Sequence, residues 1–370
     1  MSGAAALPCD GCLRRTWLLV ALAGHLGRLG GRSDDQRRLL ALGDRDLIAA
    51  LTAPGARQRE VREGYESFDP VGARGRCRAA GLVAQCRHDP AYPQPLLAMD
   101  DAPAVLHVLG AMPRFDLDRH PAVAVVGARR ASAYGLEVAR CLGRGLAAAG
   151  ITVVSGMAFG VDAAAHEGAL EAGGSTVAVL AGAAQVAYPA RKRGLHAGIA
   201  RAGAVVSELP PGFRAQRWCF PARNRVIAGL AKLTIVVEAA ERSGALITAK
   251  VAGELGRDVG AVPGRIVSPL ATGTNGLLAD GAHLISGAQK ALDVACGVGM
   301  RSTGRDAHRA ALEPRLRRIL DAVAGGAETP AALVAGGLSP GEALAGLGEL
   351  ELSGRLRRSL DGRYVPVVAP

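Results

Sequence analysis

The sequence has 370 residues, of which 49% are hydrophobic and 21% are charged, and this balance excludes an intrinsically disordered chain. The formal net charge of +11 favours an anionic partner, and the length allows two or three domains. The seven scattered cysteines argue against a disulfide framework and the apolar run 17–23 is too short to span a bilayer, so we expect a cytoplasmic protein with no membrane partner.

Residues 1–88 have the pattern of a small helical module. Leu18, Leu22 and Leu26 recur at four-residue spacing and would lie on one face of a helix. The glycine pair at 30–31 breaks the pattern, and in a module of the SAM or helix-hairpin-helix type such a turn could contact phosphate. We favour the alternative that the module serves packing.

One cysteine pair in this module has the spacing of metal ligands. Cys9-x-x-Cys12 would supply half of a zinc site, which needs two further ligands. Cys77 and Cys86 are too loosely spaced to form a second tight pair. We therefore predict no bound metal.

From Pro121 onward, short β-branched runs alternate with helical segments. Each run is nearly continuous in apolar residues, as strands buried on both faces are, which predicts an α/β doubly wound parallel sheet. The expected strands are 123–126, 151–154, 176–180, 204–207, 233–237 and 259–262. Ligands of such sheets bind at the carboxyl ends of the strands, where Gly127, Ser155, Ala181 and Glu238 stand.

Three loops at these strand ends are candidate anion sites. Glycine permits close approach of a phosphate, and the N-terminus of the following helix supplies free N–H groups. The predicted site residues are Gly127, Arg129 and Arg130 in the first loop, Ser155, Gly156, Phe159 and Gly160 in the second, and Ser243 and Gly244 in the third. The dinucleotide fingerprint G-x-G-x-x-G is absent, so we expect no NAD and no other cofactor.

The second of these loops also contains an acid and a histidine. Asp162 and His166 lie four residues apart at the start of the next predicted helix and could form a catalytic or metal-binding pair. We favour a structural role, in which Asp162 complements the helix N-terminus and His166 bonds a nearby group.

The stretch FRAQRWCFPARNR, residues 213–225, alternates arginine with aromatic residues in a chain whose aromatic content is only 3%. Arginines that bind phosphates and rings that stack on bases are the two components of a single-strand binding surface. Trp218 and Phe220 would stack on bases, or would anchor the loop in the core. Arg223, Asn224 and Arg225, at the start of a predicted helix, would bind phosphate.

After a linker at 299–312, residues 313–370 have the pattern of three helices followed by a hairpin, which is typical of a winged-helix domain. Its third helix would enter a DNA groove in such a domain, and this requires basic or amide side chains. The segment SPGEALAGLGELEL, 339–352, has three glutamates and no basic residue. We predict that this domain does not read DNA.

The motifs GARR, SGMAFGVDAAAH, VVSELP, FPARNRVIAGL, VVEAAERSGALITA and AVPG, in this order, resemble the DNA-processing protein A family, also called DprA or Smf. The resemblance implies a Rossmann-like DNA-binding core over 89–298 and places Arg129 in its pocket. It further implies single-stranded DNA binding without known catalysis, a homodimer built on the core, and loading of the RecA recombinase during natural transformation. The loop after the expected strand 176–180 departs from the family pattern at Ala181, Ala183 and Gln185, which argues against a DNA role for that loop. Gly260 replaces an aromatic residue before AVPG, which bears on packing.

An enzyme of a related fold is the alternative. Nucleoside monophosphate phosphoribohydrolases release a base from a nucleotide, and Glu238 at a strand end could stabilise a ribosyl cation. That class carries a P-G-G-x-G-T-x-x-E signature, whereas this chain has VVEAAERSGALITA at the corresponding place. We therefore expect a binding protein and no enzyme.

Overall fold

The structure is a computed structural model that describes residues 7–28, 33–302, 313–352, 355–359 and 362–366. The chain divides into two compact units, Met1–Arg301 and Ser302–Pro370. The predicted glycine turn at 30–31 and most of the predicted linker lie outside the described residues. Among the described helices, none combines the length and apolar character that crossing a bilayer requires.

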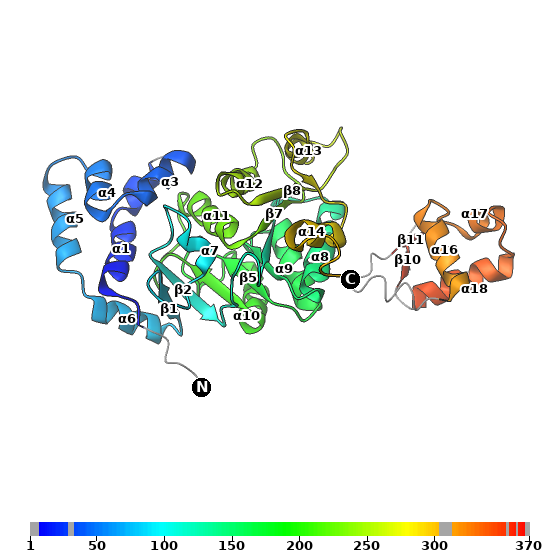
Figure 1. The fold of residues 1–370 in the computed structure, drawn as a ribbon, viewed down its shortest axis with the longest axis horizontal. Helices are drawn as coiled ribbons and strands as arrows, with labels where there is room; N and C mark the ends of the chain where they lie inside the picture. The colour runs from blue at the N-terminus through cyan, green and yellow to red at the C-terminus, as the bar shows by residue number, and fades with distance from the viewer. Residues whose placement is uncertain (1–6, 29–32, 303–312, 353–354, 360–361, 367–370) are drawn as a thin grey trace. The chain divides into compact units, whose positions relative to one another are not determined.

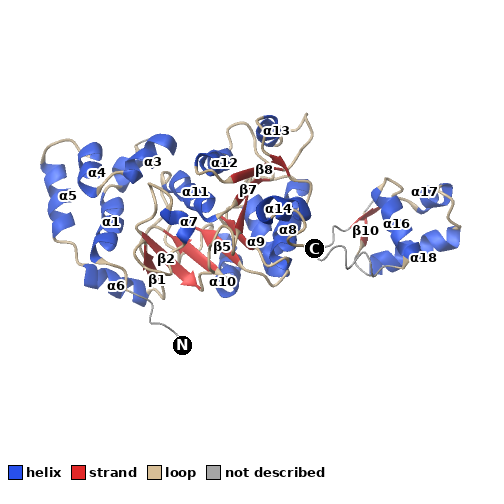
Figure 2. Ribbon diagram, viewed as in Figure 1, coloured by secondary structure: helices blue, strands red, loops and turns tan. Residues whose placement is uncertain are grey.

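A nine-stranded sheet forms the centre of the first unit (Figures 1 and 2), and its strand order is β1-β2-β6-β5-β4-β3-β7-β8-β9. The strands from β6 to β9 in this order are all parallel, and the six runs expected from the sequence correspond to β3 through β8, which confirms the doubly wound sheet. The strands are β1 (Val83–Cys86), β2 (Val105–Gly110), β3 (Ala122–Val126), β4 (Thr152–Ser155), β5 (Thr176–Val179), β6 (Ala204–Ser207), β7 (Leu233–Val236), β8 (Asp258–Ala261) and β9 (His283–Leu284).

The order of the strands reverses at β3. From there the chain adds β4, β5 and β6 on one side, and then returns to add β7, β8 and β9 on the other. The loops that leave β3 and β7 therefore run to opposite faces of the sheet and leave a crevice between them at the carboxyl ends.

Helices cover both faces of the sheet, as Figure 1 shows. Val123 and Val125 of β3 face α8 (Ala133–Ala148), α9 (Val161–Glu171) and α14 (Ala288–Cys296), while Ala124 and Val126 face α7 (Gln94–Leu97), α11 (Cys219–Leu230) and α12 (Gly244–Glu254). Both sides of β3 are thus buried, which is why its sequence is continuously apolar. The shorter elements at the periphery are η1 (Ala190–Lys192), α10 (Arg193–Ala202) and α13 (Thr272–Ala279).

The N-terminal helices pack onto this sheet and share its compact unit. They are α1 (Asp10–Ala21), α2 (Ala23–Gly27), α3 (Ser33–Ala41), α4 (Asp44–Leu51), α5 (Ala56–Glu66) and α6 (Pro70–Ala79). The predicted leucine stripe of α1 and α2 is buried in one cluster with Trp218 and Ala222, which lie at the start of α11. Strands β1 and β2, which were not among the expected strands, form an antiparallel edge beside β6.

The second unit has its own small core. Helices α16 (Pro314–Ala324), α17 (Pro330–Ala335) and α18 (Pro340–Leu352) precede an antiparallel pair, β10 (Leu356–Arg358) and β11 (Tyr364–Pro366). Ser339 and Glu342 form the expected capping box: the Ser339 amide donates to Glu342 Oε2 at 3.1 Å and the Glu342 amide to Ser339 Oγ at 3.3 Å. The order of elements is the one the sequence indicates, and assignment as a winged helix stays a prediction.

Candidate nucleic-acid interface

A pocket of about 520 Å³ lies at the carboxyl ends of β3 and β7, where the strand order reverses. Its charged lining consists of three arginines and one acid, so the pocket is net positive. The polar and aromatic residues that line it are Arg129, Asp162, Arg217, Trp218, Phe220, Arg223, Asn224, Ser243 and Thr248. Gly27 of α2 contributes to the wall, which brings the N-terminal helices to the edge of the site.

Arg129 and Phe220 form the exposed side of the pocket. The guanidinium carbon of Arg129 lies 5.1 Å from the centre of the Phe220 ring, a cation–π arrangement that holds the charged group over an aromatic face. Phe220 also contacts Tyr188, with ring centres 5.7 Å apart and planes tilted by 52°. Tyr188 is 49% exposed. One positive group and two aromatic rings are therefore adjacent at the surface.

Tyr188 and Arg217 were not among the predicted site residues. Tyr188 belongs to the loop after β5, whose departures from the family pattern argued against a DNA role, yet the structure places its ring on Phe220. Arg217 is exposed and lines the pocket. Two sequence features could have indicated these residues: the aromatic side chain of Tyr188 before Pro189, and the repeated arginines of 213–225, which include Arg217.

Arg223 supplies positive charge to the floor of the pocket from a buried position. Its Nη1 donates to the carbonyl oxygens of Gly156 and Val179, each at 2.6 Å, and its Nε donates to Asn224 Oδ1 at 3.1 Å. A Cβ on Gly156 would lie 2.3 Å from the Arg223 guanidinium carbon, so glycine is required there for this contact rather than for a phosphate. Burial lowers the pKa of Arg223, and the nearby Asp162 opposes that shift.

The N-terminus of α12 opens onto the pocket. Ser243 caps this helix by accepting from the Ala245 amide at 3.3 Å, and a Cβ at Gly244 would meet no atom within 4 Å. Asn224 Nδ2 donates to the Gly244 carbonyl at 3.2 Å and so links α11 to this terminus. The end of an eleven-residue helix carries partial positive charge and free amides that suit an anion.

The loop after β3 differs from the expected anion site. Glu238 already occupies the N-terminus of α8: Ser132 donates to it through its amide at 2.8 Å and its hydroxyl at 2.5 Å. Ser155 is also wrong as an anion ligand, because its buried hydroxyl donates to the Val125 carbonyl at 2.6 Å. Glu238 does not line the pocket, so the geometry gives no support to a role at a ribosyl cation.

The two remaining predicted glycines serve contact between loops. A Cβ at Gly127 would lie 2.7 Å from Val161 Cγ2, and a Cβ at Gly160, whose φ is +80°, would lie 2.2 Å from the Ala128 carbonyl oxygen. Phe159 and Arg130 are exposed but lie outside the pocket lining.

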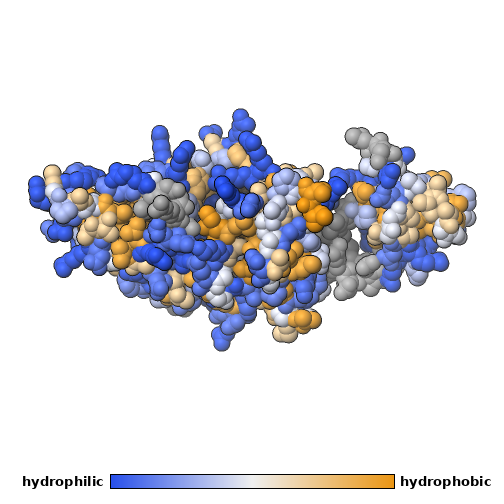
Figure 3. All heavy atoms as spheres, turned by 90° about the horizontal axis from the view of Figure 1, so that it is seen from above, coloured by the Kyte–Doolittle hydropathy of each residue, from blue (hydrophilic) through white to orange (hydrophobic). Residues whose placement is uncertain are grey.

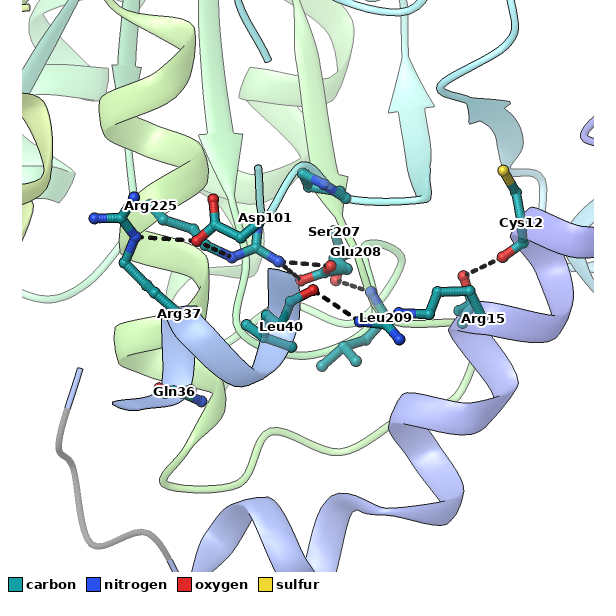
Figure 4. A network of polar contacts seen from close by, with 12 residues as sticks. Cys12, Arg15, Gln36, Arg37, Leu40, Asp101, Ser207, Glu208, Leu209 and Arg225 are labelled. Carbon is teal, nitrogen blue, oxygen red and sulfur yellow. Dashed lines mark hydrogen bonds and ion pairs between the residues drawn. The ribbon is translucent and has the colours of Figure 1, made fainter. Parts of the chain in front are cut away.

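Arg225 is buried, which corrects its predicted role as a phosphate ligand. Its side chain is 1% exposed, and Nη2 lies 2.7 Å from Glu208 Oε1 while Nε lies 3.6 Å from Asp101 Oδ2. Figure 4 shows Arg225 and Arg37 converging on Asp101 beside α3. Residues two apart on a helix point about 200° apart, so Arg223 and Arg225 cannot face the same side.

Trp218 is also a core residue, and the stacking alternative for it is wrong. The residue is 4% exposed and packs with the buried leucines of α1 and α2. Its Nε1 donates to Gln216 Oε1 at 3.2 Å, and its carbonyl accepts from Gln36 Nε2 at 2.8 Å. Trp218 therefore anchors the N-terminal helices to the start of α11.

Asp162 and His166 have the structural environment that the sequence favours. Asp162 accepts from the Ala158 amide at 3.4 Å, and burial raises its pKa. His166 is fully buried with Nδ1 at 2.6 Å from Thr176 Oγ1, and burial lowers its pKa to about 3. The two side chains have separate partners and do not form a catalytic pair.

Known proteins resemble this chain across the sheet and its loops. The family described as DNA recombination-mediator protein A matches residues 84–295. A putative DNA processing protein DprA of Mycobacterium tuberculosis is 42% identical over 268 residues, which are 71% of this chain and 68% of that protein. The DNA processing protein DprA of Streptococcus pneumoniae is 42% identical over 204 residues, 55% of this chain and 71% of that protein.

Two solved structures resemble the fold. The X-ray structure of DprA from Streptococcus pneumoniae aligns with a TM-score of 0.61 and 34% identity, covering 76% of this chain and 95% of that one. A structure of DNA processing protein A from Helicobacter pylori, described for its single-stranded DNA binding mode, aligns with a TM-score of 0.51 and 28% identity, covering 58% of this chain and 96% of that one.

Proposed function

This chain belongs to the DNA recombination-mediator protein A family, and we propose that it binds single-stranded DNA in the pocket at the carboxyl ends of β3 and β7. The observation that carries the proposal is the exposed guanidinium of Arg129 held 5.1 Å above the Phe220 ring. A single strand presents an anionic backbone and unstacked base faces at the same time, and this pair of side chains matches both.

The pocket distributes the two kinds of contact over separate elements. Arg129, Arg217 and the N-terminus of α12 are suited to phosphates. The Phe220 ring is suited to bases, as is the exposed Tyr188 ring that contacts it beside the pocket. Base stacking contributes about 1–3 kcal/mol per base and depends little on sequence. A duplex keeps its bases stacked and hidden from such rings, so we expect strong preference for single strands.

We also propose that the protein acts as a homodimer. Figure 3 shows hydrophobic residues exposed among hydrophilic ones on the face that it draws. Exposed apolar side chains in and near the β8–β9 edge include Tyr134, Ile266, Val267 and Leu284, and Ile266 is 93% exposed. Tyr134 belongs to this edge because its hydroxyl donates to the Pro263 carbonyl at 3.2 Å. Light scattering at micromolar concentration tests the dimer, and a monomer with and without DNA would contradict it.

The family description supports a further proposal, that the protein mediates recombination by loading RecA on incoming single strands during natural transformation. The proposed role requires no catalytic step, and Glu238, the residue of the alternative enzyme, is engaged by Ser132. Release of a base from AMP by the purified protein would contradict a purely binding function.

Binding of labelled single-stranded and duplex oligonucleotides of equal length across a salt series tests the function. Arg129→Ala should weaken single-strand binding and reduce the log–log salt slope by about 0.7 for each phosphate that the variant no longer neutralises. Arg201→Ala is the matched control. Arg201 is exposed in the last turn of α10, which leads into the amino end of β6, whereas the pocket lies at the carboxyl ends of the parallel strands. Equal affinity for duplex, or equally weakened binding in the two variants, would contradict the proposal.

A further inference from the structure

Four ligand-type side chains converge where the first helix meets the edge of the sheet. Cys9 is the N-cap residue of α1 and Cys12 lies in its first turn, while Cys86 ends β1 and His88 follows it. Their sulfur and ring nitrogen atoms all lie within 4.8 Å of one another. The sulfurs of Cys9 and Cys12 are each 3.4 Å from His88 Nδ1.

The two sulfur–nitrogen distances match the edge of a zinc coordination tetrahedron. With Zn–S of about 2.3 Å and Zn–N of about 2.0–2.1 Å, tetrahedral angles place a sulfur and a nitrogen ligand about 3.5 Å apart. Three thiolates and one imidazole form a ligand set that structural zinc sites use. Calcium and magnesium prefer oxygen ligands, so the chemistry of this cluster excludes them.

The surroundings hold the four ligands in place. Cys9 is the N-cap residue of α1, so its backbone position is set by the start of that helix. Arg74 donates from Nε and Nη2 to the Pro8 carbonyl, at 3.1 and 2.8 Å, and so fixes the residue just before Cys9. Cys12 and Cys86 are each 3% exposed in one apolar cluster, whereas His88 is exposed, which leaves a path for an ion to enter.

We propose that Cys9, Cys12, Cys86 and His88 bind one structural Zn²⁺ ion. The ion fastens the start of α1 to the end of β1, two segments that are far apart in the sequence, and so attaches the N-terminal helices to the antiparallel edge of the sheet. The proposal departs from the prediction of no metal that the sequence favoured. The spacing of the cysteines alone did not indicate the site, because its other half is Cys86-x-His88, a mixed pair on a strand end.

The test is zinc content of the full-length protein purified without chelator, measured by plasma mass spectrometry. We expect about one zinc per chain, and a large loss in Cys12→Ser and in His88→Gln. Cys77→Ser is the matched control, because Cys77 is buried in the same apolar cluster but is not one of the four ligands, and this variant should retain the metal.

A second measurement does not depend on the folding of any variant. Wild-type protein stripped of metal and given Co²⁺ should show the absorption bands of tetrahedral cobalt–thiolate, and Cys9, Cys12 and Cys86 should react with an alkylating agent only after chelation. A folded, reduced wild type that binds neither zinc nor cobalt would overturn the proposal. A Cys9–Cys12 disulfide in protein purified under reducing conditions, or full zinc retention in a Cys12→Ser, Cys86→Ser double variant, would overturn it as well.

Discussion

The pocket of the first unit and helix α18 of the second unit differ in what they offer to DNA. The pocket is lined by Arg129, Arg217 and Arg223 against a single acid, with the half-buried Phe220 ring beside Arg129. Helix α18 has three glutamates and no basic residue, and Glu349 pairs with Arg315 at 2.9 Å. The comparison teaches that two units of one chain can differ in the charge and aromatic surface that a DNA strand requires, and our proposal places the binding site on the unit that has both.

The largest effect should come from Arg225, which holds together the unit that contains the pocket. Removing one partner of a buried ion pair costs about 3–5 kcal/mol, because the largely buried Glu208 then has no counter-charge and Asp101 keeps only Arg37. We expect Arg225→Ala to lower the thermal unfolding transition of the first unit and to leave that of the second unit unchanged, as measured by calorimetry. If the unfolding temperature of the first unit were unchanged in this variant, the buried ion pairs of Arg225 would not be stabilising that unit.

Lowering the pH should decrease the folding stability of the first unit, because two of its histidines are buried in their neutral form. Burial lowers the pKa of His107 to about 4 and that of His166 to about 3, whereas the unfolded value is 6.5. Between those values the unfolded chain binds protons that the folded chain does not, so stability is full above about pH 6.5 and falls as pH decreases. Each histidine contributes at most about 1.4 kcal/mol per pH unit.

Urea unfolding at about pH 7 and about pH 5 measures this dependence on either side of the ordinary histidine pKa. The variants His107→Asn and His166→Asn should each reduce it, and His120→Asn, at an exposed residue, should not. The second unit has no histidine among its described residues. A loss of stability of equal steepness in both units would contradict the assignment.

A smaller effect is expected from the aromatic side chains of the first unit, and it distinguishes a ring that stacks on a base from a ring that is only exposed. Phe220→Ala should cost about 1–3 kcal/mol of single-strand binding, because the ring offers one base a stacking face. Phe159→Ala is the control, because Phe159 is exposed but does not line the pocket. Fluorescence anisotropy with a labelled oligonucleotide measures both, and a greater loss in the control would move the binding surface onto the loop after β4.

Much of the fold follows from the sequence because strands buried on both faces are nearly continuously apolar, as β3 through β7 are. Strands β1 and β9 lie outside that rule, since β1 alternates in burial and β9 has only two residues. Strand β2 is buried over most of its length but contains His107, and it was not expected from the sequence.

The site was predictable only as a region. Sequence spacing shows that Arg223 and Arg225 point to opposite sides of a helix, but only the packed structure shows which side is buried. Trp218 could stack or pack for the same reason, and contact with α1 and α2 decides it. Cys86 and His88 reach Cys9 and Cys12 only after the sheet edge has formed.

The most direct test of the central claim compares single-stranded DNA binding by the full chain with binding by residues 1–301, the first compact unit. If the pocket is the binding site, the affinity of the shorter protein should stay within a few fold of the full-length value, and residues 302–370 alone should bind weakly. A hundredfold loss, about 2.7 kcal/mol, in a shorter protein that still folds and dimerises would place the binding site in the second unit.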